Sequence, residues 1–304
     1  MDKRKKSKSN RFEEAVLPQL LTLPTTLMIF MFIILPSLFN IVLSFTNYSF
    51  VNPDRRFVGL RNYINLIGDD VIWSAFVVTL TWTVSNIIPI FVLGIIVALL
   101  MNTNLKGIGF LKAIILLPWI LPEVVTGYTW RWMLMSDFGI LHNFLTGIGV
   151  ISSDFSFFSM KSGAMIGVVM SNVWRSFPFI SVMLYAKIKS LPRDLTEAAS
   201  LDGANSFQIF RHITVSWIMP VLGRLLWLMS IWLFNAFAII YVMTRGGPGT
   251  FTATLPLLMH RYAFTHYKIG EAATIGCIIM LFMIIMTIVV RALLKIRNRL
   301  QQEL

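Results

Sequence analysis

Residues 71–101, VIWSAFVVTLTWTVSNIIPIFVLGIIVALLM, decide the fold because this stretch contains no Asp, Glu, Lys or Arg. An α-helix rises about 1.5 Å per residue, so about 20 apolar residues are enough to cross a hydrocarbon layer of roughly 30 Å. A buried helix of a water-soluble domain rarely needs an apolar run of this length. The sequence therefore predicts a membrane-spanning helix over Val71–Met101.

Five further apolar runs accompany this one. In the whole chain 56% of the residues are hydrophobic and 13% are charged, which leaves too little polar surface to cover a core in water. We therefore expect an all-α polytopic membrane protein with about six transmembrane helices. The predicted spans are Leu20–Phe45, Val71–Met101, Phe110–Leu134, Ala164–Ala186, Val215–Val242 and Ala272–Leu294.

The distribution of Lys and Arg predicts how these spans are oriented. The chain has a net charge of +12, and six of its 26 cations lie in the first 11 residues. The tails and loops on the side of the two termini hold 16 cations, whereas the loops on the other side hold seven. By the positive-inside rule, both termini are predicted to be cytoplasmic. The lipid membrane accounts for this charge, and no motif for binding nucleic acid accompanies it.

The predicted domain organisation is one membrane domain between two short tails. Residues 1–16 are expected to form a basic cytoplasmic N-terminal tail, residues 17–298 the six-helix domain, and residues 299–304 a cytoplasmic C-terminal tail. No small-residue cleavage site follows the first apolar run, so we expect this run to remain as an uncleaved span.

Pro118 and Pro122, one helical turn apart in the third run, predict a break in that span. Each proline removes a backbone hydrogen bond and bends its helix. Other runs also contain prolines, such as Pro89 and Pro178, but single kinks are ordinary packing devices in membrane helices. The closely spaced pair is the better candidate for a break that lines a cavity.

The loop between the fourth and fifth runs, residues 188–214, has the sequence IKSLPRDLTEAASLDGANSFQIFRHIT. Pro192 favours the start of a helix, Asp194 or Thr196 can cap it, and Glu197 suits its positive N-terminal end. This loop is therefore predicted to contain a short helix rather than a plain connection.

The second part of the loop predicts a reversal and another helix. Asp202-Gly203 permits a sharp turn because glycine tolerates a positive φ. A second helix can then begin near Ala204 and present three apolar side chains on one face: Phe207, Phe210 and Ile213. An amphipathic connector that lies on the membrane surface is the alternative interpretation of this pattern.

The loop resembles the cytoplasmic loop of the permease subunits of ATP-binding-cassette importers, whose signature is Glu-Ala-Ala, three residues, Gly. That signature stands here as Glu197-Ala198-Ala199 followed by Gly203, with Ile213 at the expected later position. The usual Leu-Pro is replaced by Val215-Ser216, which leaves the start of the fifth span open. The resemblance implies the type I importer permease fold, with a cytoplasmic coupling helix that docks on an ATPase. The implied coupling residues are Glu197, Ala198, Ala199, Asp202, Gly203, Ala204, Phe207 and Phe210.

The resemblance extends over nearly the whole chain and points to the carbohydrate-uptake branch, with the maltose-type and multiple-sugar permeases. The matching stretches include Phe57-Val58-Gly59-Leu60, Leu117-Pro118-Trp119, Trp130-Arg131-Trp132 and Gly246-Gly247-Pro248. The resemblance implies a permease subunit in a bacterial inner membrane that forms half of the path for a sugar or oligosaccharide. The implied partners are a second homologous permease, two copies of a cassette ATPase, and an extracellular or periplasmic solute-binding protein. ATP and Mg²⁺ are expected in the ATPase subunits, with no cofactor bound by this chain.

Sugar recognition in a membrane cavity usually pairs aromatic faces with hydrogen-bonding groups, and the third to fifth runs supply both. Glu123 is notable because a carboxylate within a span is costly and usually faces a partner or a wet cavity. At the outer mouth, however, it would contact only water. Trp and Tyr are also enriched at bilayer interfaces, so anchoring is the alternative role of each aromatic residue. The candidates for the substrate path are Trp119, Glu123, Tyr128, Trp130, Asn172, Trp174, Arg175, Asn235 and Tyr241.

Three other function classes have less support. An enzyme is not indicated, because the sequence shows no Ser-His-Asp order, metal-ligand spacing or phosphate-binding loop. Cys277 is the only cysteine, so no internal disulfide can form. Because the sequence shows no phosphate-binding loop, ATP hydrolysis is expected in a partner subunit. An importer permease for a solute other than sugar and a stand-alone secondary transporter remain the alternative functions.

Overall fold

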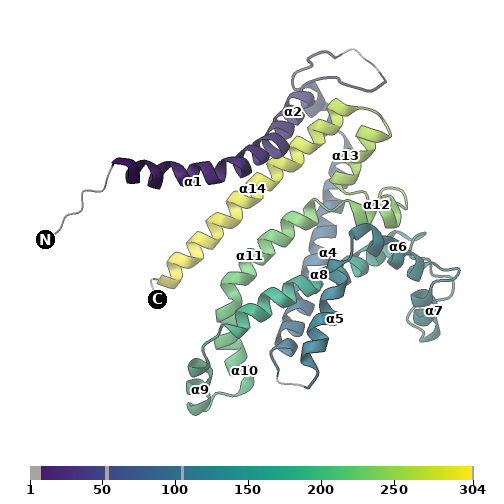
Figure 1. Ribbon diagram of the computed structural model, residues 1–304. Helices are drawn as coiled ribbons and strands as arrows, with labels where there is room; N and C mark the ends of the chain where they lie inside the picture. The colour runs from purple at the N-terminus through teal and green to yellow at the C-terminus, as the bar shows by residue number, and fades with distance from the viewer. Residues whose placement is uncertain (1–7, 52–54, 104–105, 303–304) are drawn as a thin grey trace. The chain divides into compact units, whose positions relative to one another are not determined.

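The computed structural model describes residues 8–51, 55–103 and 106–302, with side chains described between residues 18 and 292 (Figure 1). The described residues form helices and no strand, apart from one isolated bridge between Thr46 and Phe57. The all-α prediction is therefore confirmed. Parts of the two predicted tails, residues 1–7 and 303–304, lie outside the described residues.

Five helices are long and apolar enough to cross a membrane, and a bent helix pair raises the number to six. This agrees with the prediction of about six spans. The five continuous helices are Pro18–Ser44, Asp70–Met101, Lys161–Lys189, Ser206–Phe234 and Ile269–Ala292. The second, fourth and sixth predicted spans lie within, or coincide with, α4 (Asp70–Met101), α8 (Lys161–Lys189) and α14 (Ile269–Gln302).

The third predicted span, Phe110–Leu134, is not one continuous helix. Helix α5 (Ile108–Ile120) and α6 (Glu123–Leu134) meet at an angle of 97°. Leu121 and Pro122 between them are extended, with ψ angles of 136° and 142°. Proline disfavours the helical conformation in the residue before it, which explains why α5 ends at that point. The predicted break is thus confirmed, and the predicted continuous span is corrected.

The fifth predicted span, Val215–Val242, is wrong at both ends. The helical run starts at Ser206, with α10 (Ser206–Gln208) and a π-helical turn leading into α11 (Val215–Phe234). The run ends before Asn235, whose side-chain Nδ2 and backbone N–H both donate to the Ile231 carbonyl. A separate helix, α12 (Ala238–Thr244), follows.

The chain divides into two compact units. The first contains residues 1–66 and 262–278, and the second contains residues 67–261 and 279–304. The helices of the first unit before residue 66 are α1 (Lys8–Ile29), a π-helical segment (Phe30–Ile34), α2 (Leu35–Ser44) and most of α3 (Arg61–Ile67). Helix α1 therefore starts inside the predicted N-terminal tail.

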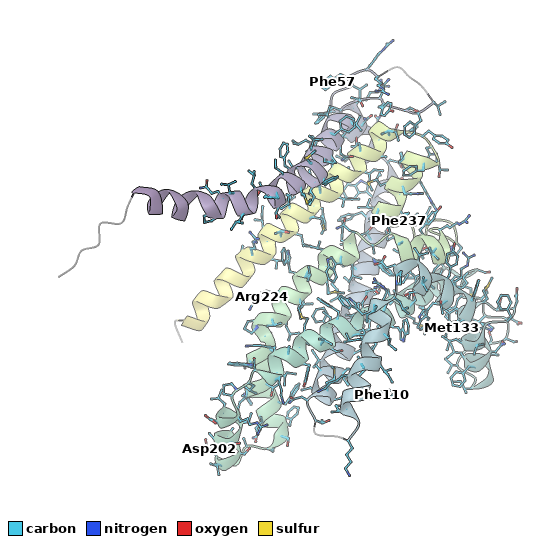
Figure 2. The ribbon with its side chains drawn as sticks, in the orientation of Figure 1. Phe57, Phe110, Met133, Asp202, Arg224 and Phe237 are labelled. Atoms are coloured by element: carbon cyan, nitrogen blue, oxygen red, sulfur yellow. The ribbon has the colours of Figure 1, made fainter. Side chains whose placement is uncertain are left out.

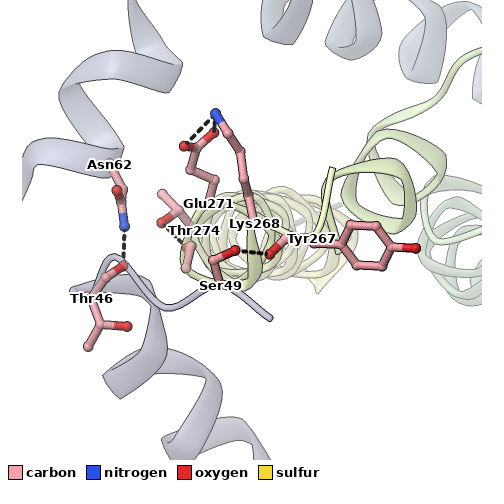
Figure 3. Close-up of polar contacts among 8 residues, drawn as sticks. Thr46, Ser49, Asn62, Tyr267, Lys268, Glu271 and Thr274 are labelled. Carbon is pink, nitrogen blue, oxygen red and sulfur yellow. Dashed lines mark hydrogen bonds and ion pairs between the residues drawn. The ribbon is translucent and has the colours of Figure 1, made fainter. Parts of the chain in front are cut away.

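Polar contacts in the first unit satisfy backbone carbonyls at the end of α2. Asn62 of α3 donates from Nδ2 to the carbonyls of Ser44 (2.9 Å) and Thr46 (2.8 Å), as Figure 3 shows for Thr46. Thr274 of α14 donates to the Ser44 carbonyl at 3.1 Å. Burial raises the pKa of the Tyr63 phenol, which lies 2.7 Å from the Ser44 hydroxyl. Because the last carbonyls of a helix lack partners within it, these contacts join α2, α3 and α14.

The second unit is organised around the contact between α4 and α8. Gly94 of α4 faces Ile180 of α8 so closely that a Cβ at position 94 would lie 2.5 Å from the Ile180 Cγ2. Asn172 of α8 donates from Nδ2 to the Asn86 Oδ1 of α4 at 2.7 Å, and both side chains are buried. Small residues and buried amides are the usual means by which membrane helices associate.

Four further helices of the second unit pack against this pair. Helices α5, α6, α11 and α12 contact α8, and α11 also contacts α4. The Trp82 indole of α4 donates to the Leu233 carbonyl of α11 at 3.0 Å. The other helices are α7 (Ile140–Gly147), α9 (Arg193–Leu201) and α13 (Leu255–Phe264), the last of which crosses the unit boundary.

Replacing Gly94 by alanine is expected to destabilise the second unit by about 1–3 kcal/mol, because the added methyl group overlaps the branched carbon of Ile180. The melting temperature of the purified chain in detergent measures this. Gly109→Ala is the matched control, since no atom lies within 4 Å of its added Cβ. Equal melting temperatures for Gly94→Ala and the original chain would show that α4 and α8 are not closely packed.

Candidate functional site

The 188–214 loop forms a helical hairpin between α8 and α11. Helix α9 begins directly after Pro192, and the chain reverses at Gly203, which has a φ of +85°. Both features were predicted from the sequence. The predicted cap was wrong, because Asp194 and Thr196 lie inside α9 and Thr196 donates to the Arg193 carbonyl.

The second arm of the hairpin has a strong local start. Asn205 and Gln208 form a capping box, with hydrogen bonds of 2.8 and 2.9 Å between each side chain and the other residue's backbone N–H. Such reciprocal bonds satisfy two N–H groups that have no partner within the helix. This cap fixes α10 just after the reversal at Gly203.

Helix α9 contains no buried residue. Leu195 is 48% exposed and Leu201 is 89% exposed, and Phe207 on the second arm is 66% exposed. A nine-residue helix is marginal in isolation, and most helical stability in proteins comes from packing of an apolar face. The apolar side chains of this hairpin are therefore available to a partner.

The predicted coupling residues lie together on this hairpin, with Asp202 at its tip (Figure 2). A hollow of about 350 Å³ lies between the arms, and four of these residues line it: Ala199, Asp202, Gly203 and Ala204. Glu197, Ala198 and Phe207 are exposed, and Phe210 is half-buried. His212 also lines the hollow, although sequence analysis did not single it out.

Trp217 joins the two arms at the base of the hairpin. Its indole N–H donates to the Lys187 carbonyl at 3.1 Å, and the Lys187 ammonium lies 3.8 Å from the centre of the indole ring. The same N–H lies 3.4 Å from the Ser190 hydroxyl. These contacts tie the end of α8 to the start of α11. Trp217 was not predicted from the sequence, because thirty residues separate it from Lys187 and no local motif marks the pair.

A second group of predicted residues meets at the bend between α5 and α6. The Arg175 Nη1 of α8 lies 3.3 Å from the Glu123 Oε1, and the Arg175 Nε donates to the Leu121 carbonyl at 3.3 Å. The side chains of Arg175 and Glu123 are 20% and 39% exposed. Glu123 therefore has a charged partner, and the interpretation in which it contacts only water is wrong.

Aromatic rings lie beside this ion pair. Trp119 of α5 stacks on Phe179 of α8 with ring centres 5.3 Å apart, and Trp232 of α11 lies at the same distance from Phe179. Trp130 and Trp174 form another pair, at 5.8 Å. Phe179 and Trp232 were missed by sequence analysis, although Phe179 follows Arg175 by one helical turn and so shares its helix face.

The other predicted substrate residues have different surroundings. Asn172 is bonded to Asn86 inside the α4–α8 contact, and Asn235 ends α11. Tyr241 of α12 stacks on Phe237 at the start of the same helix, with ring centres 5.1 Å apart. Tyr128 is half exposed on α6. The structure thus pairs Glu123 with Arg175 and stacks Trp119 on Phe179, one helical turn from Arg175, and it places these four elsewhere. Among the described residues, no group of three or more His, Cys, Asp or Glu could hold a metal ion.

Comparison with known proteins points to one family. The model of the family described as "Binding-protein-dependent transport system inner membrane component" matches residues 88–299. The trehalose/maltose transport system permease protein MalF of Thermococcus litoralis is 35% identical and covers 86% of each chain. The inner membrane ABC transporter permease protein YcjO of Escherichia coli is 29% identical and covers 89% of this chain and 90% of its own.

Two solved structures share the fold. One is a bacterial ABC transporter involved in the import of the acidic polysaccharide alginate, with 20% identity, a TM-score of 0.82, and coverage of 94% of this chain and 97% of the other. The other is a bacterial alginate ABC transporter in complex with an alginate pentasaccharide-bound periplasmic protein, with 20% identity, a TM-score of 0.80, and coverage of 92% and 94%. At this identity the likeness shows the fold, which is that of a type I ABC importer permease, as the sequence predicted.

Replacing Trp217 by phenylalanine keeps an aromatic ring under Lys187 but removes the indole N–H. One hydrogen bond contributes about 0.5–1.5 kcal/mol net. Hydrogen exchange at the backbone amides of α9 and its flanks is therefore expected to rise about threefold to tenfold. Trp227→Phe is the matched control, because it removes an indole N–H from the same helix at its contact with Thr287. Equal exchange in both variants would contradict a clamp at the base of the hairpin.

Proposed function

The chain belongs to the family of binding-protein-dependent transport system inner membrane components, and we propose that it transports a sugar or oligosaccharide. The transport would be driven by an ATPase that is coupled to this chain. As an ABC importer permease, the chain is a transport component of the membrane and not an enzyme. The single observation that carries the coupling proposal is the 188–214 hairpin, which holds the Glu-Ala-Ala-to-Gly signature on a helix without a buried residue.

The hairpin is the proposed docking element for the ATPase. Glu197, Ala198 and Phe207 are exposed, and the hollow beside Ala199 and Gly203 gives the surface a shape that a partner can fill. A short helix without a buried residue contributes little to the stability of its own chain. Nucleotide-driven closure of the ATPase subunits would move this hairpin and, through it, α8 and α11.

The proposed assembly follows from the role of the chain as one half of a path. A second homologous permease would supply the other half, and two cassette ATPase subunits would bind ATP and Mg²⁺ beneath the two hairpins. A periplasmic or extracellular binding protein would deliver the solute. Cations are in excess on the side of the membrane that holds the hairpin and both termini. This excess supports a cytoplasmic location for the hairpin, the N-terminus and the C-terminus.

The bend between α5 and α6 is the proposed sugar-contacting part of the chain. Trp119, Phe179 and Trp232 offer a row of aromatic rings, and the Glu123–Arg175 pair offers hydrogen-bond acceptors and donors beside them. Aromatic faces suit the C–H faces of a sugar, and charged groups bind its hydroxyls. The transport of trehalose and maltose by the MalF relative supports the same substrate class.

Replacing Gly203 by valine is expected to abolish uptake while the chain still inserts and folds. No atom lies within 4 Å of a Cβ at this position, so the effect comes from the backbone, whose φ is +85°. A β-branched residue in this conformation is strained by about 1–3 kcal/mol. Gly203→Asn is the matched control, because asparagine adopts positive φ more readily and should retain much of the uptake.

Uptake of radiolabelled maltose or trehalose by membrane vesicles, together with copurification of the ATPase, measures this coupling. The valine variant should lose both sugar uptake and copurification of the ATPase. Uptake by the original chain should require ATP. Normal uptake by Gly203→Val would contradict coupling through the hairpin. Uptake that persists without the ATPase would instead identify a stand-alone secondary transporter.

Replacing Trp119 by leucine is expected to raise the KM for the transported sugar about tenfold, since stacking contributes roughly 0.5–1.5 kcal/mol beyond the area it buries. Glu123→Gln should also raise the KM, because it removes the charge that orients Arg175. Trp132→Leu is the matched control: Trp132 is 63% exposed on α6 and forms no part of the aromatic row. The same KM in Trp119→Leu and Trp132→Leu would show that the aromatic residues only anchor the chain in the bilayer.

A further inference from the structure

A second polar pocket lies at the other end of α5, away from the bend. Helix α4 ends at Met101, α5 begins at Ile108, and α8 ends at Lys189. The pocket between these ends has a volume of about 240 Å³. It is lined chiefly by Asn102, Thr103, Ile108, Lys112, Tyr185 and Lys189. Lys189 is the second residue of the 188–214 loop, and none of these residues is a predicted coupling residue or part of the proposed sugar site.

The pocket is positively charged. The Lys112 ammonium donates to the Tyr185 hydroxyl at 2.7 Å and lies 4.2 Å from the centre of its ring, so it is held in one place. Lys189 supplies a second cation, and no carboxylate is among the lining residues. In the part of the chain that the structure describes, neither lysine forms an ion pair.

The start of α5 adds to this charge. Gly107 stands at the N-cap and offers no side chain to the first N–H groups, and Ile108 at the first position lines the pocket. The unpaired N–H groups at the start of a helix carry a partial positive charge. With two ammonium groups, a phenol, an amide and a hydroxyl, the pocket is suited to a phosphate group.

Exposed apolar side chains lie within two residues of the pocket lining on α5 and α4. Phe110, labelled in Figure 2, is 74% exposed, and Leu111, Ile114 and Leu100 are between 42% and 48% exposed. A free phosphate ion would make no use of this surface, whereas the acyl chains of a lipid would cover it. The ends of two membrane-spanning helices, α4 and α8, and the start of α5 also place the pocket where head groups lie at the edge of the hydrocarbon layer.

We propose that this pocket binds the phosphate of an anionic phospholipid, with Lys112 and Lys189 as the main ligands and the acyl chains along α5. Basic pockets between helices at the cytoplasmic face of a membrane bind such head groups, and each Lys near an anionic surface contributes to the affinity. The proposal concerns a lipid and does not depend on which solute is transported.

Native mass spectrometry of the full chain, purified with any partner subunits that accompany it, tests this site. Phosphatidylglycerol or phosphatidylcholine is titrated into the detergent solution. The Lys112→Gln/Lys189→Gln variant should bind phosphatidylglycerol at least about tenfold more weakly, because two cations are lost. Its binding of phosphatidylcholine should not change, which also shows that the variant is folded.

Two further variants sharpen the test. Lys161→Gln/Lys268→Gln removes two cations outside the pocket, one of them at the opposite end of α8, and should leave phosphatidylglycerol binding unchanged. Tyr185→Phe keeps the ring under Lys112 but removes the hydroxyl, so a smaller loss of about twofold to fivefold is expected. Undiminished phosphatidylglycerol binding by the Lys112→Gln/Lys189→Gln variant would overturn the proposal. Displacement of the lipid by equimolar inorganic phosphate would also overturn it, in favour of a site for the free ion.

Discussion

The close contact between α4 and α8 is the interaction on which the second unit depends. Water-soluble proteins hold helices together by removing apolar surface from water, but lipid offers no such driving force between spans. Close packing at Gly94 and the buried Asn86–Asn172 bond take its place. Four other helices contact α8. The α4–α8 pair therefore determines where the bend, the base of the hairpin and the end of α11 lie.

The absence of water in the bilayer also explains where the helices break. Non-helical backbone at membrane depth is tolerated only where protein or a wet cavity satisfies its polar groups. The bend at Leu121 meets this condition, since Arg175 donates to the freed carbonyl and is itself neutralised by Glu123. The break and the ion pair therefore support each other. A charged pair inside a span and an interrupted helix are each costly alone. At this bend the cost of each is reduced, because Arg175 both pairs with Glu123 and donates to the Leu121 carbonyl.

The sequence predicted the spans well because length and apolarity are properties of a single segment. Pro118 and Pro122 likewise predicted the break in the third span, since proline acts on its own backbone. The end of α11 at Asn235 carried no such local mark and was missed. Glu123 and Arg175 were both candidates for the substrate path, but their pairing depends on how α8 packs against the bend. Asn172 is the opposite case. Its amide side chain is of a type that binds sugars, but in the folded chain it is hydrogen-bonded to Asn86.

The hairpin and the proposed sugar site are connected through the helices that they share. Helix α8 carries Arg175 and Phe179 and leads into the hairpin, and α11 leaves the hairpin and carries Trp232. Because Trp217 and Lys187 join the two helices at the base, movement of α9 acts on both at once. The contact between Phe179 and Trp232 lies between these same two helices. If the ATPase moves the hairpin, this aromatic contact is therefore the part of the sugar site most directly exposed to the change.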